Sequence, residues 1–499
     1  EIGSGLVGSE MCIRDRFVDR DNDIWMYSPL GIWVYNPEQE KWLSWLTNII
    51  KRRSHNMVRA VSQDKQGRIW IGTDQDGIDI LDKKTGEVRQ LRNKAGDERS
   101  LQNNTVMVLY EDSSETMWVG TYKKGISYFN ECAFKFGAEY IGDISCIEED
   151  KEGYVWLGTN DVGIIYWNSV TGNRAAFPQK GMDKLTTDAI VCILKAGDGK
   201  LWIGTFGGGL ICYDNGRIIH YKKNISERQN SLAHNNVLAL AEDKQGIIWI
   251  GTLGGGVQSL NPKTGLFTTY NTTSAGLISD YVSSLCMGKE GSLWIGTAQG
   301  LSELDIETKK VVNLEGTKSG KEYFSDQNIS QVYEDSRGLI WIGTCEGLNV
   351  YNPKTDELII LGVEQGVSSP IISGIVEDGN ENIWVTTARG ITNVIPAVDL
   401  KTGRYIFHSC VYDDKDGLQN SGFNLRSIKK LSSGEILMGG LYGINRFRPD
   451  DIKYNKKRPS VMFTRLFLFN EEVGVGEEYE GRVILDKALN KVCLLYTSP

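Results

Sequence analysis

A tryptophan-centred segment repeats along the chain and constrains its fold more than any other feature. Residues 338–344 are GLIWIGT, and residues 246–252 are GIIWIGT. Related segments surround Trp25, Trp70, Trp118, Trp156, Trp202, Trp294 and Trp384, and a tenth copy has Leu437 in the tryptophan position. From Trp202 to Trp341 the copies follow one another at intervals of 47, 45 and 47 residues. A propeller blade of four strands repeats at roughly 40–50 residues.

Each unit has the pattern of short strands. In one unit the apolar runs are residues 237–241, 247–252, 257–260 and 266–270, with turns between them. Asp243 and Gly246 are typical of a tight turn, and no helical periodicity extends over ten residues. The strand around Trp249 is apolar at consecutive positions, so we expect it to be covered on both faces, as between stacked blades. We interpret the repeated tryptophans as core residues and not as sugar platforms.

Ten repeats are too many for one ring, because propellers typically have four to eight blades. The spacing from Trp118 to Trp156 is 38 residues, the shortest between tryptophans of the array. We therefore expect an all-β chain: a complete seven-bladed ring of four-stranded blades, preceded by three blades of a second propeller and followed by the start of an Ig-like β-sandwich. The expected boundaries are 1–16 (unrelated end sequence), 17–132 (three blades), 133–450 (seven-bladed ring), 451–459 (linker), 460–491 (truncated Ig-like domain) and 492–499 (unrelated end sequence).

The last blade of the ring has only three apolar runs, residues 427–431, 435–438 and 444–447. Residues 133–140 have no blade of their own, and their apolar side chains alternate with polar or small ones. A ring that pairs its two chain ends removes both unpaired edges. The sequence therefore predicts antiparallel pairing of residues 133–140 with residues 444–447.

Composition and motifs argue against several classes of function. The net charge of −9 disfavours nucleic acid as a partner, and no apolar run approaches the roughly 20 residues of a membrane helix. The nine cysteines form no C-x-x-C pair, and the four histidines lack metal-ligand spacing. Residues 19–23 begin like a calcium loop, but Ile24 stands where that loop needs glycine. We expect no metal, no cofactor and no catalytic residue, although the sequence leaves a glycosidase-type carboxylate pair open.

The chemistry that remains is binding by loops. The loops that follow the tryptophan strands vary in sequence on a regular scaffold, which is how loops carry specificity. Sugars are bound by aromatic faces together with amide, carboxylate or guanidinium groups. The candidate ligand-binding residues, each of which could instead be an ordinary loop residue, are Phe206, Asn235, Tyr281, Gln299, Glu346, Arg389 and Tyr442.

Residues 334–348, EDSRGLIWIGTCEGL, resemble the two-component regulator propeller repeat, and the likeness extends over residues 17–491. Residues 416–424 and 439–447 are similar to the last blade before a triple-tyrosine, Ig-like domain. The resemblance implies a periplasmic sensor region of a hybrid two-component system with two seven-bladed propellers, truncated here at both ends. It further implies an oligosaccharide ligand, a homodimeric receptor and relay to a histidine kinase outside this segment. The alternatives are a scaffold for protein–protein contact or receptor dimerisation and, third, a propeller lyase or hydrolase.

Overall fold

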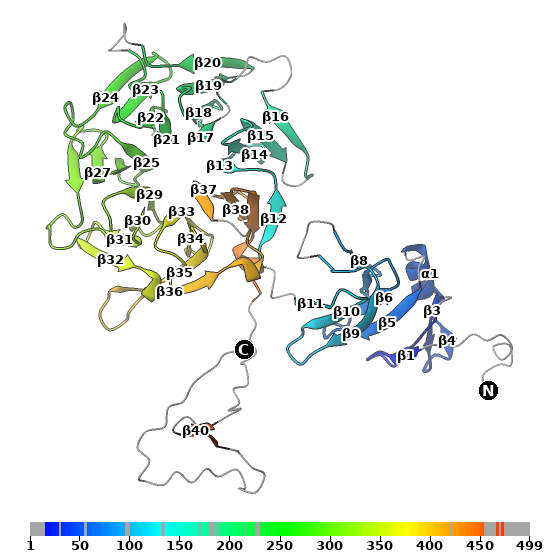
Figure 1. The fold of residues 1–499 in the computed structure, drawn as a ribbon. Coiled ribbons are helices and arrows are strands. Elements are labelled where there is room, and N and C mark those ends of the chain that lie inside the picture. The colour runs from blue at the N-terminus through cyan, green and yellow to red at the C-terminus, as the bar shows by residue number, and fades with distance from the viewer. Residues whose placement is uncertain are drawn as a thin grey trace. The chain divides into compact units, whose positions relative to one another are not determined.

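The computed structural model consists almost entirely of antiparallel β-sheets (Figure 1). It describes residues 15–28, 31–53, 57–94, 100–130, 135–168, 171–178, 185, 187, 189–214, 216–224, 230–419, 422–453, 466–468 and 471–473. Residues 1–453 and 454–499 are separate compact units. In the second unit the described residues form the hairpin of β40 (Leu466–Leu468) and β41 (Glu471–Val473). The rest of the expected Ig-like segment 460–491 and the end sequence at 492–499 lie outside the described residues, and the Ig-like domain stays a prediction.

Three sheets precede the ring. The first contains β1 (Asp15–Val18), β2 (Ile24–Ser28), β3 (Gly31–Asn36) and β4 (Lys41–Trp42), and the second contains β5 (Val58–Gln63), β6 (Ile69–Thr73), β7 (Ile78–Leu81) and β8 (Val88–Leu91). The third has three strands, β9 (Val106–Glu111), β10 (Met117–Thr121) and β11 (Ile126–Phe129). Strand β1 begins at Asp15, two residues before the expected boundary, and pairs with β2. The helix α1 (Ser44–Arg53), which the sequence pattern did not indicate, buries Leu46 against the first sheet.

Seven four-stranded sheets form the ring; the strand nearest the centre in Figure 1 is the first along the chain in six of them and β37 (Phe423–Lys430) in the seventh. The first three sheets are β13 (Ile144–Glu149), β14 (Tyr154–Thr159), β15 (Ile164–Asn168) and β16 (Arg174–Phe177); β17 (Ile190–Lys195), β18 (Leu201–Thr205), β19 (Leu210–Asp214) and β20 (Arg217–Tyr221); and β21 (Val237–Glu242), β22 (Ile248–Thr252), β23 (Val257–Asn261) and β24 (Leu266–Tyr270). The next three are β25 (Val282–Met287), β26 (Ser292–Thr297), β27 (Gly300–Asp305) and β28 (Val311–Leu314); β29 (Ile329–Glu334), β30 (Ile340–Thr344), β31 (Leu348–Asn352) and β32 (Glu357–Leu361); and β33 (Ile372–Glu377), β34 (Ile383–Thr387), β35 (Gly390–Val398) and β36 (Tyr405–Tyr412). Three short 3₁₀ turns are also described, η1 (Val363–Gln365), η2 (Asp414–Asp416) and η3 (Pro449–Asp451).

The seventh sheet joins the two ends of the ring. It contains β37 (Phe423–Lys430), β38 (Ile436–Gly440), β39 (Gly443–Phe447) and β12 (Gly137–Tyr140). Strand β12 pairs antiparallel with β39, from Gly137 opposite Arg446 to Tyr140 opposite Gly443. The pairing predicted from sequence is therefore confirmed for residues 137–140, while residues 133 and 134 lie outside the described residues. The division of the chain into domains at the other boundaries stays a prediction.

In seven of the nine tryptophan repeats, an aspartate holds the turn before the tryptophan strand. In the turn at Asp243, Oδ1 accepts hydrogen bonds from the backbone N–H groups of Gln245 and Ile247. Oδ2 accepts from Nε1 of Trp249 at 3.0 Å. Six other tryptophans donate to the equivalent aspartate at 2.7–3.0 Å, namely Trp25, Trp70, Trp118, Trp156, Trp341 and Trp384. These aspartates therefore have a structural role, as expected for turn residues.

The tryptophans pack against the neighbouring sheet. Trp249 lies in one cluster with Val282 and Leu293 of the next blade, and a Cβ on Gly251 would come within 2.7 Å of the Val282 side chain. The expectation that every repeat tryptophan is a core residue is wrong for Trp118, which is 40 % exposed. Trp70 is covered by the third sheet, but among the described residues no fourth sheet of this kind follows Trp118. The other eight tryptophans of the series are buried.

Glutamates at the ends of the innermost strands join neighbouring blades. Glu242 accepts a hydrogen bond from the backbone N–H of Gly197, in the turn of the preceding blade, at 2.7 Å. Glu149 accepts in the same way from Ser432, across the junction of the last blade with the first. The same contact recurs at Glu111, Glu334 and Glu377. The face of the ring that carries the turns is thus occupied by bonds that hold the blades together.

Candidate functional site

The opposite face of the ring carries the loops that follow the tryptophan strands. In several blades the first loop residue donates its backbone N–H to the carbonyl of the residue that precedes the innermost strand. These bonds join Asn160 to Asp143, Phe206 to Ala189, Leu253 to Asn236, Ala298 to Tyr281 and Ala388 to Ile371, at 3.1–3.4 Å. The loops therefore lie at the beginnings of the innermost strands. We call the loops at residues 160–163, 206–209, 253–256, 298–299, 345–346, 388–389 and 441–442, with the residues that precede the innermost strands, the loop face.

Six of the seven candidate ligand-binding residues are exposed on the loop face. The aromatic side chains of Phe206, Tyr281 and Tyr442 are 54 %, 54 % and 57 % exposed. The polar residues Gln299, Glu346 and Arg389 are also exposed. Most large aromatic side chains of the propeller are buried. These three are exposed and are therefore available to a ligand.

Asn235 has a different environment from the other six candidates. Its Oδ1 accepts a hydrogen bond from the backbone N–H of Lys223 at 2.8 Å, and its carbonyl accepts from Gly209. Asn104 makes the same pair of contacts, with Asn93 and Gly77, in the three sheets that precede the ring, which we call the front sheets. The recurrence shows that Asn235 holds the connection between two blades, so its amide oxygen is already used.

Four candidates occupy equivalent positions in four successive blades. Gln299, Arg389 and Tyr442 each stand immediately before the glycine that begins the third strand of the blade, and Glu346 precedes Gly347, which lies directly before that strand. In three of them the backbone N–H donates to the threonine that ends the tryptophan strand, at 3.1–3.2 Å. This backbone bond fixes the loop and leaves the side chain free. The ring thus presents an amide, a carboxylate, a guanidinium and a phenol in order around one arc.

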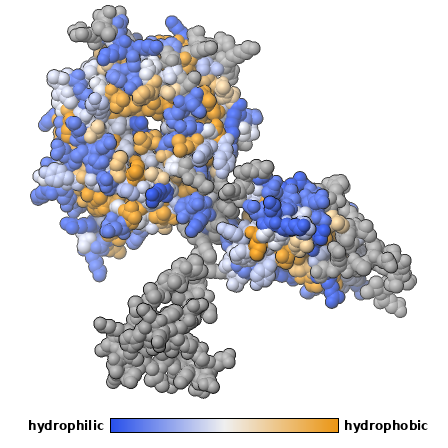
Figure 2. Space-filling model, in the orientation of Figure 1, coloured by the Kyte–Doolittle hydropathy of each residue, from blue (hydrophilic) through white to orange (hydrophobic). Residues whose placement is uncertain are grey.

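The structure adds polar residues that the sequence reasoning missed. The carboxylate of Asp143 accepts from Nδ2 of Asn160 at 2.8 Å and from Nδ2 of Asn424 at 2.6 Å. Oδ1 of Asn236 accepts from the backbone N–H of Gly207 at 2.7 Å. Their repeat positions could have indicated them, since each lies just before or within the beginning of an innermost strand. On the visible face of the ring, hydrophobic patches are interrupted by hydrophilic side chains (Figure 2).

Three of the nucleophiles and bases near this face, His234, Cys192 and Cys286, are engaged in the fold or buried. Nδ1 of His234 accepts a hydrogen bond from the backbone N–H of Asn236 at 3.0 Å. Burial raises the pKa of Cys192 to about 12 and that of Cys286 to about 11, so both thiols stay protonated at neutral pH. Cys345 is exposed on the loop face. The groups gathered here can form hydrogen bonds and aromatic contacts with a ligand.

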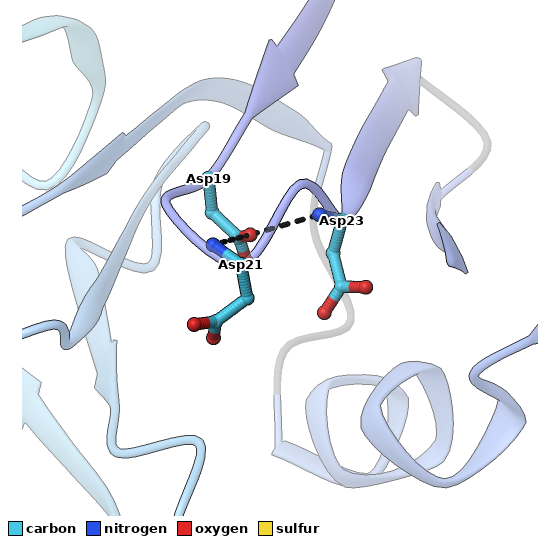
Figure 3. A group of neighbouring side chains, drawn as sticks. All are labelled: Asp19, Asp21 and Asp23. Carbon is cyan, nitrogen blue, oxygen red and sulfur yellow. Dashed lines mark hydrogen bonds between the residues drawn. The ribbon is translucent and has the colours of Figure 1, made fainter. Parts of the chain in front are cut away.

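A cluster of carboxylates lies in the first sheet, at residues 19–23. The carboxylates of Asp19, Asp21 and Asp23 approach one another within 4.8 Å (Figure 3). Nζ of Lys83 lies 2.7 Å from an oxygen of each. Burial disfavours the charged lysine, but its hydrogen bonds to the three carboxylates outweigh this and raise the pKa of Lys83. The hydrogen bond from Lys83 lowers the pKa of Asp21. The ammonium group therefore takes the position that a cation would need.

The geometry is that of a rigid ring with one variable face, and comparisons with known proteins assign its repeat. The two-component regulator propeller family model matches residues 53–75, 100–123, 141–161, 184–207, 231–254, 276–299 and 323–346. The chain therefore carries two-component regulator propeller repeats. A curated relative, histidine kinase P4 of Formosa agariphila, is 25 % identical over 290 residues. That match covers 57 % of this chain and 20 % of the kinase, so the chain corresponds to about a fifth of its relative.

Solved structures share the fold. The extracellular domain of the hybrid two-component system BT3049 from B. thetaiotaomicron is similar with a TM-score of 0.72 at 24 % identity, over 93 % of this chain and 61 % of that one. The extracellular domain of the one-component system BT4673 from the same organism is similar with a TM-score of 0.53 at 20 % identity, over 94 % and 62 %. The all-β propeller fold predicted from sequence is confirmed. No described helix has the length and apolar character needed to cross a membrane.

Proposed function

Because the chain carries two-component regulator propeller repeats, we propose that it is the periplasmic, ligand-sensing region of a two-component receptor that recognises oligosaccharides. Binding is relayed to a histidine kinase outside this segment, in a homodimeric receptor. The observation that carries the proposal is the loop face. There, exposed aromatic rings and polar side chains stand on loops whose backbones are fixed by repeated hydrogen bonds.

Several physical arguments support an oligosaccharide. Sugar rings offer apolar faces to aromatic side chains and hydroxyl groups to amides, carboxylates and guanidinium groups. Phe206, Tyr281 and Tyr442 supply the first kind of group, and Gln299 and Glu346 supply the second. Their fixed backbones reduce the entropy that a ligand must overcome when it orders a site.

The test is binding of the full chain to a glycan array, followed by calorimetry on the glycans that bind. Each aromatic contact contributes about 0.5–1.5 kcal/mol. The double substitution Phe206→Ala and Tyr442→Ala should therefore weaken binding about 5- to 150-fold. Leu266→Ala is the matched control, because Leu266 is 58 % exposed on the outermost strand β24, away from the loops. Absence of binding to every glycan, or equal binding by the double variant, would contradict the proposal.

A scaffold for protein contact is the second candidate, and one feature favours it. The third front sheet exposes four large apolar or aromatic residues by 55–69 %, namely Val108, Tyr110, Ile126 and Tyr128. Exposed apolar surface of this kind is typical of an interaction site. Light scattering of the full chain would support this function if the chain were a dimer that Tyr110→Lys with Tyr128→Lys made monomeric. A monomer at all concentrations would count against it.

A further inference from the structure

One arginine extends across the axis of the ring. Nη1 of Arg426, on β37, donates to the backbone carbonyl of Leu238 at 3.0 Å and to that of Ser283. Leu238 belongs to β21 and Ser283 to β25, whereas the sheets next to β37 in the ring are those of β33 and β13. The side chain therefore runs from the seventh blade to the third and fourth, on the other side of the axis.

The backbone around Arg426 forms a bulge in β37. The pairing of β37 with β38 passes from Phe423 opposite Gly440 to Ile428 opposite Met438, so four residues of β37 face a single residue of β38. In β21 the corresponding irregularity is the one residue between Val237 and Ala239. Arg426 has a φ of 61°, in the left-handed region that few residues other than glycine adopt.

Both ends of this bulge are anchored to the first blade. Nδ2 of Asn424 donates to the carbonyl of Ile144 at 2.8 Å, and Oγ of Ser427 donates to the same carbonyl at 2.9 Å. Between these anchors, Leu425 is 51 % exposed and Arg426 points across the axis. The cost of a left-handed, non-glycine residue, about 1–3 kcal/mol, persists only where the surroundings fix the conformation.

The positive charge of Arg426 has carbonyl partners and no anionic partner within the described part of the chain. Among the described residues, the Arg426 side chain has no ion pair with a carboxylate, and its hydrogen bonds are those of Nη1 to the two carbonyls. Arginine remains protonated in proteins. A guanidinium group binds carboxylate, sulfate or phosphate through paired N–H donors, with bonds roughly twice as strong as those to neutral acceptors.

The position of the guanidinium group is close to the loop face. The carbonyls that receive it belong to the second residues of β21 and β25, and these strands begin at the loop face. Tyr281 directly precedes β25, and the carbonyl of Asn236, directly before β21, accepts from Leu253 of the loop face. The carbonyls that hold Arg426 thus lie two residues into strands that begin at the loop face, within reach of a ligand that enters the axis from this face.

We propose that Arg426 is an oxyanion-binding residue at the axis of the loop face, and that the ligand is an acidic oligosaccharide, with a carboxylate or a sulfate group. The proposal rests on the proposed function, and it names the class of glycan that the same face takes. The neutral groups of the sugar contact the loop residues, and the oxyanion accepts from Nε and Nη2 of Arg426. Nη1 stays bonded to the two carbonyls, which keep the guanidinium group in place.

The experiment compares acidic and neutral glycans with the same backbone on an array probed with the full chain. Polygalacturonan is set against its fully methyl-esterified form for the carboxylate, and κ-carrageenan against its desulfated form for the sulfate. We expect the acidic member of a pair to be bound and its neutral counterpart to bind about 10- to 100-fold more weakly, as for loss of a hydrogen bond to a charged group. Arg426→Gln should remove this preference, and Arg426→Lys should retain only part of it.

Lys244→Gln is the control, because it removes one positive charge from an exposed turn on the other face of the ring. It should leave the preference unchanged. Thermal unfolding checks that Arg426→Gln still folds. If that variant does not fold, the comparison of acidic with neutral glycans on the wild-type chain still tests the inference. Preference for neutral glycans, or an unchanged preference in a folded Arg426→Gln variant, would overturn this inference and leave the proposed function standing. Absence of binding to any glycan would overturn both.

Discussion

At the scale of single residues, one repeat of the ring lacks the hydrogen bond between the turn aspartate and the tryptophan indole. At Trp202 the turn position is Ala196, and the buried Nε1 of Trp202 has no hydrogen-bond partner. The turn at Ala196 keeps the same backbone bonds as the turn at Asp243. An aspartate at position 196 could therefore reach the indole as Asp243 does.

Ala196→Asp should raise the free energy of unfolding by about 0.5–1.5 kcal/mol, the usual contribution of one hydrogen bond. Asp243→Ala should lower it by about 1–3 kcal/mol, because the indole and two backbone N–H groups lose their acceptor. Urea unfolding monitored by tryptophan fluorescence measures both. If Ala196→Asp destabilises the chain while Asp243→Ala has no effect, the bond does not have the stabilising role assigned to it.

Lys83 provides a second prediction at this scale. Lys83→Met leaves the carboxylates of Asp19, Asp21 and Asp23 without their cation, and loss of one partner of a buried ion pair costs about 3–5 kcal/mol. Since the folded-state pKa of Asp21 is lowered, its contribution is present above the unfolded pKa of about 3.9 and is lost as the pH falls through the folded value. The unfolding temperature of the wild type should drop more than that of Lys83→Met on acidification. Addition of calcium should leave the unfolding temperature of the wild type unchanged. A clear rise of that temperature with calcium would show that the cluster binds metal.

At the scale of elements, burial of the tryptophan strand depends on the presence of the next sheet. Trp249→Ala should lower the free energy of unfolding by about 3–5 kcal/mol, as for a large aromatic removed from a core. Trp118→Ala should cost clearly less, because its side chain is 40 % exposed. Thermal unfolding of the two variants gives the comparison. Equal losses, or no loss for Trp249→Ala, would mean that the strand does not pack between blades as described.

The elements could be predicted because the repeat carries a local cause for each strand. Asp243, Gly246 and Trp249 specify the turn, the strand and its burial within a few residues of one another. Trp118 has the same local sequence, so its exposure could not be foreseen; it depends on a neighbouring sheet and not on the strand itself. The helix α1 was missed because it is an isolated insertion in one blade and has no repeat to indicate it.

The candidate site was predictable only in part, because the repeat determines loop positions but not the contacts that loop residues make with distant parts of the chain. The loop positions of Gln299, Glu346 and Arg389 followed from the repeat, and their exposure agrees with a binding role. The bonded state of Asn235 became clear only when its contacts with Lys223 and Gly209 were known. Arg426 lies in a bulge longer than those of the other described blades, and its partners are 143 and 188 residues away in the chain. Contacts of that length leave no trace in a periodic pattern.

At the scale of the whole molecule, the pairing of β12 with β39 makes the seven sheets a closed ring. Strand β12 supplies the outermost strand of the last sheet, which thereby has four strands like the other six sheets of the ring. Phe136, immediately before it, is buried between Tyr412 and Phe447. Closure fixes the positions of the seven loops relative to one another. A loop face with a defined arrangement of ligand groups therefore depends on it.

Hydrogen–deuterium exchange on the full chain tests this closure most directly. If β12 closes the ring, the hydrogen-bonded amides within residues 137–140 exchange as slowly as those of β38, because opening them requires opening of the last blade. If residues 137–140 exchange at the rate of exposed loops while β38 stays protected, the ring is not closed by this strand, and the arrangement of the loop face fails with it.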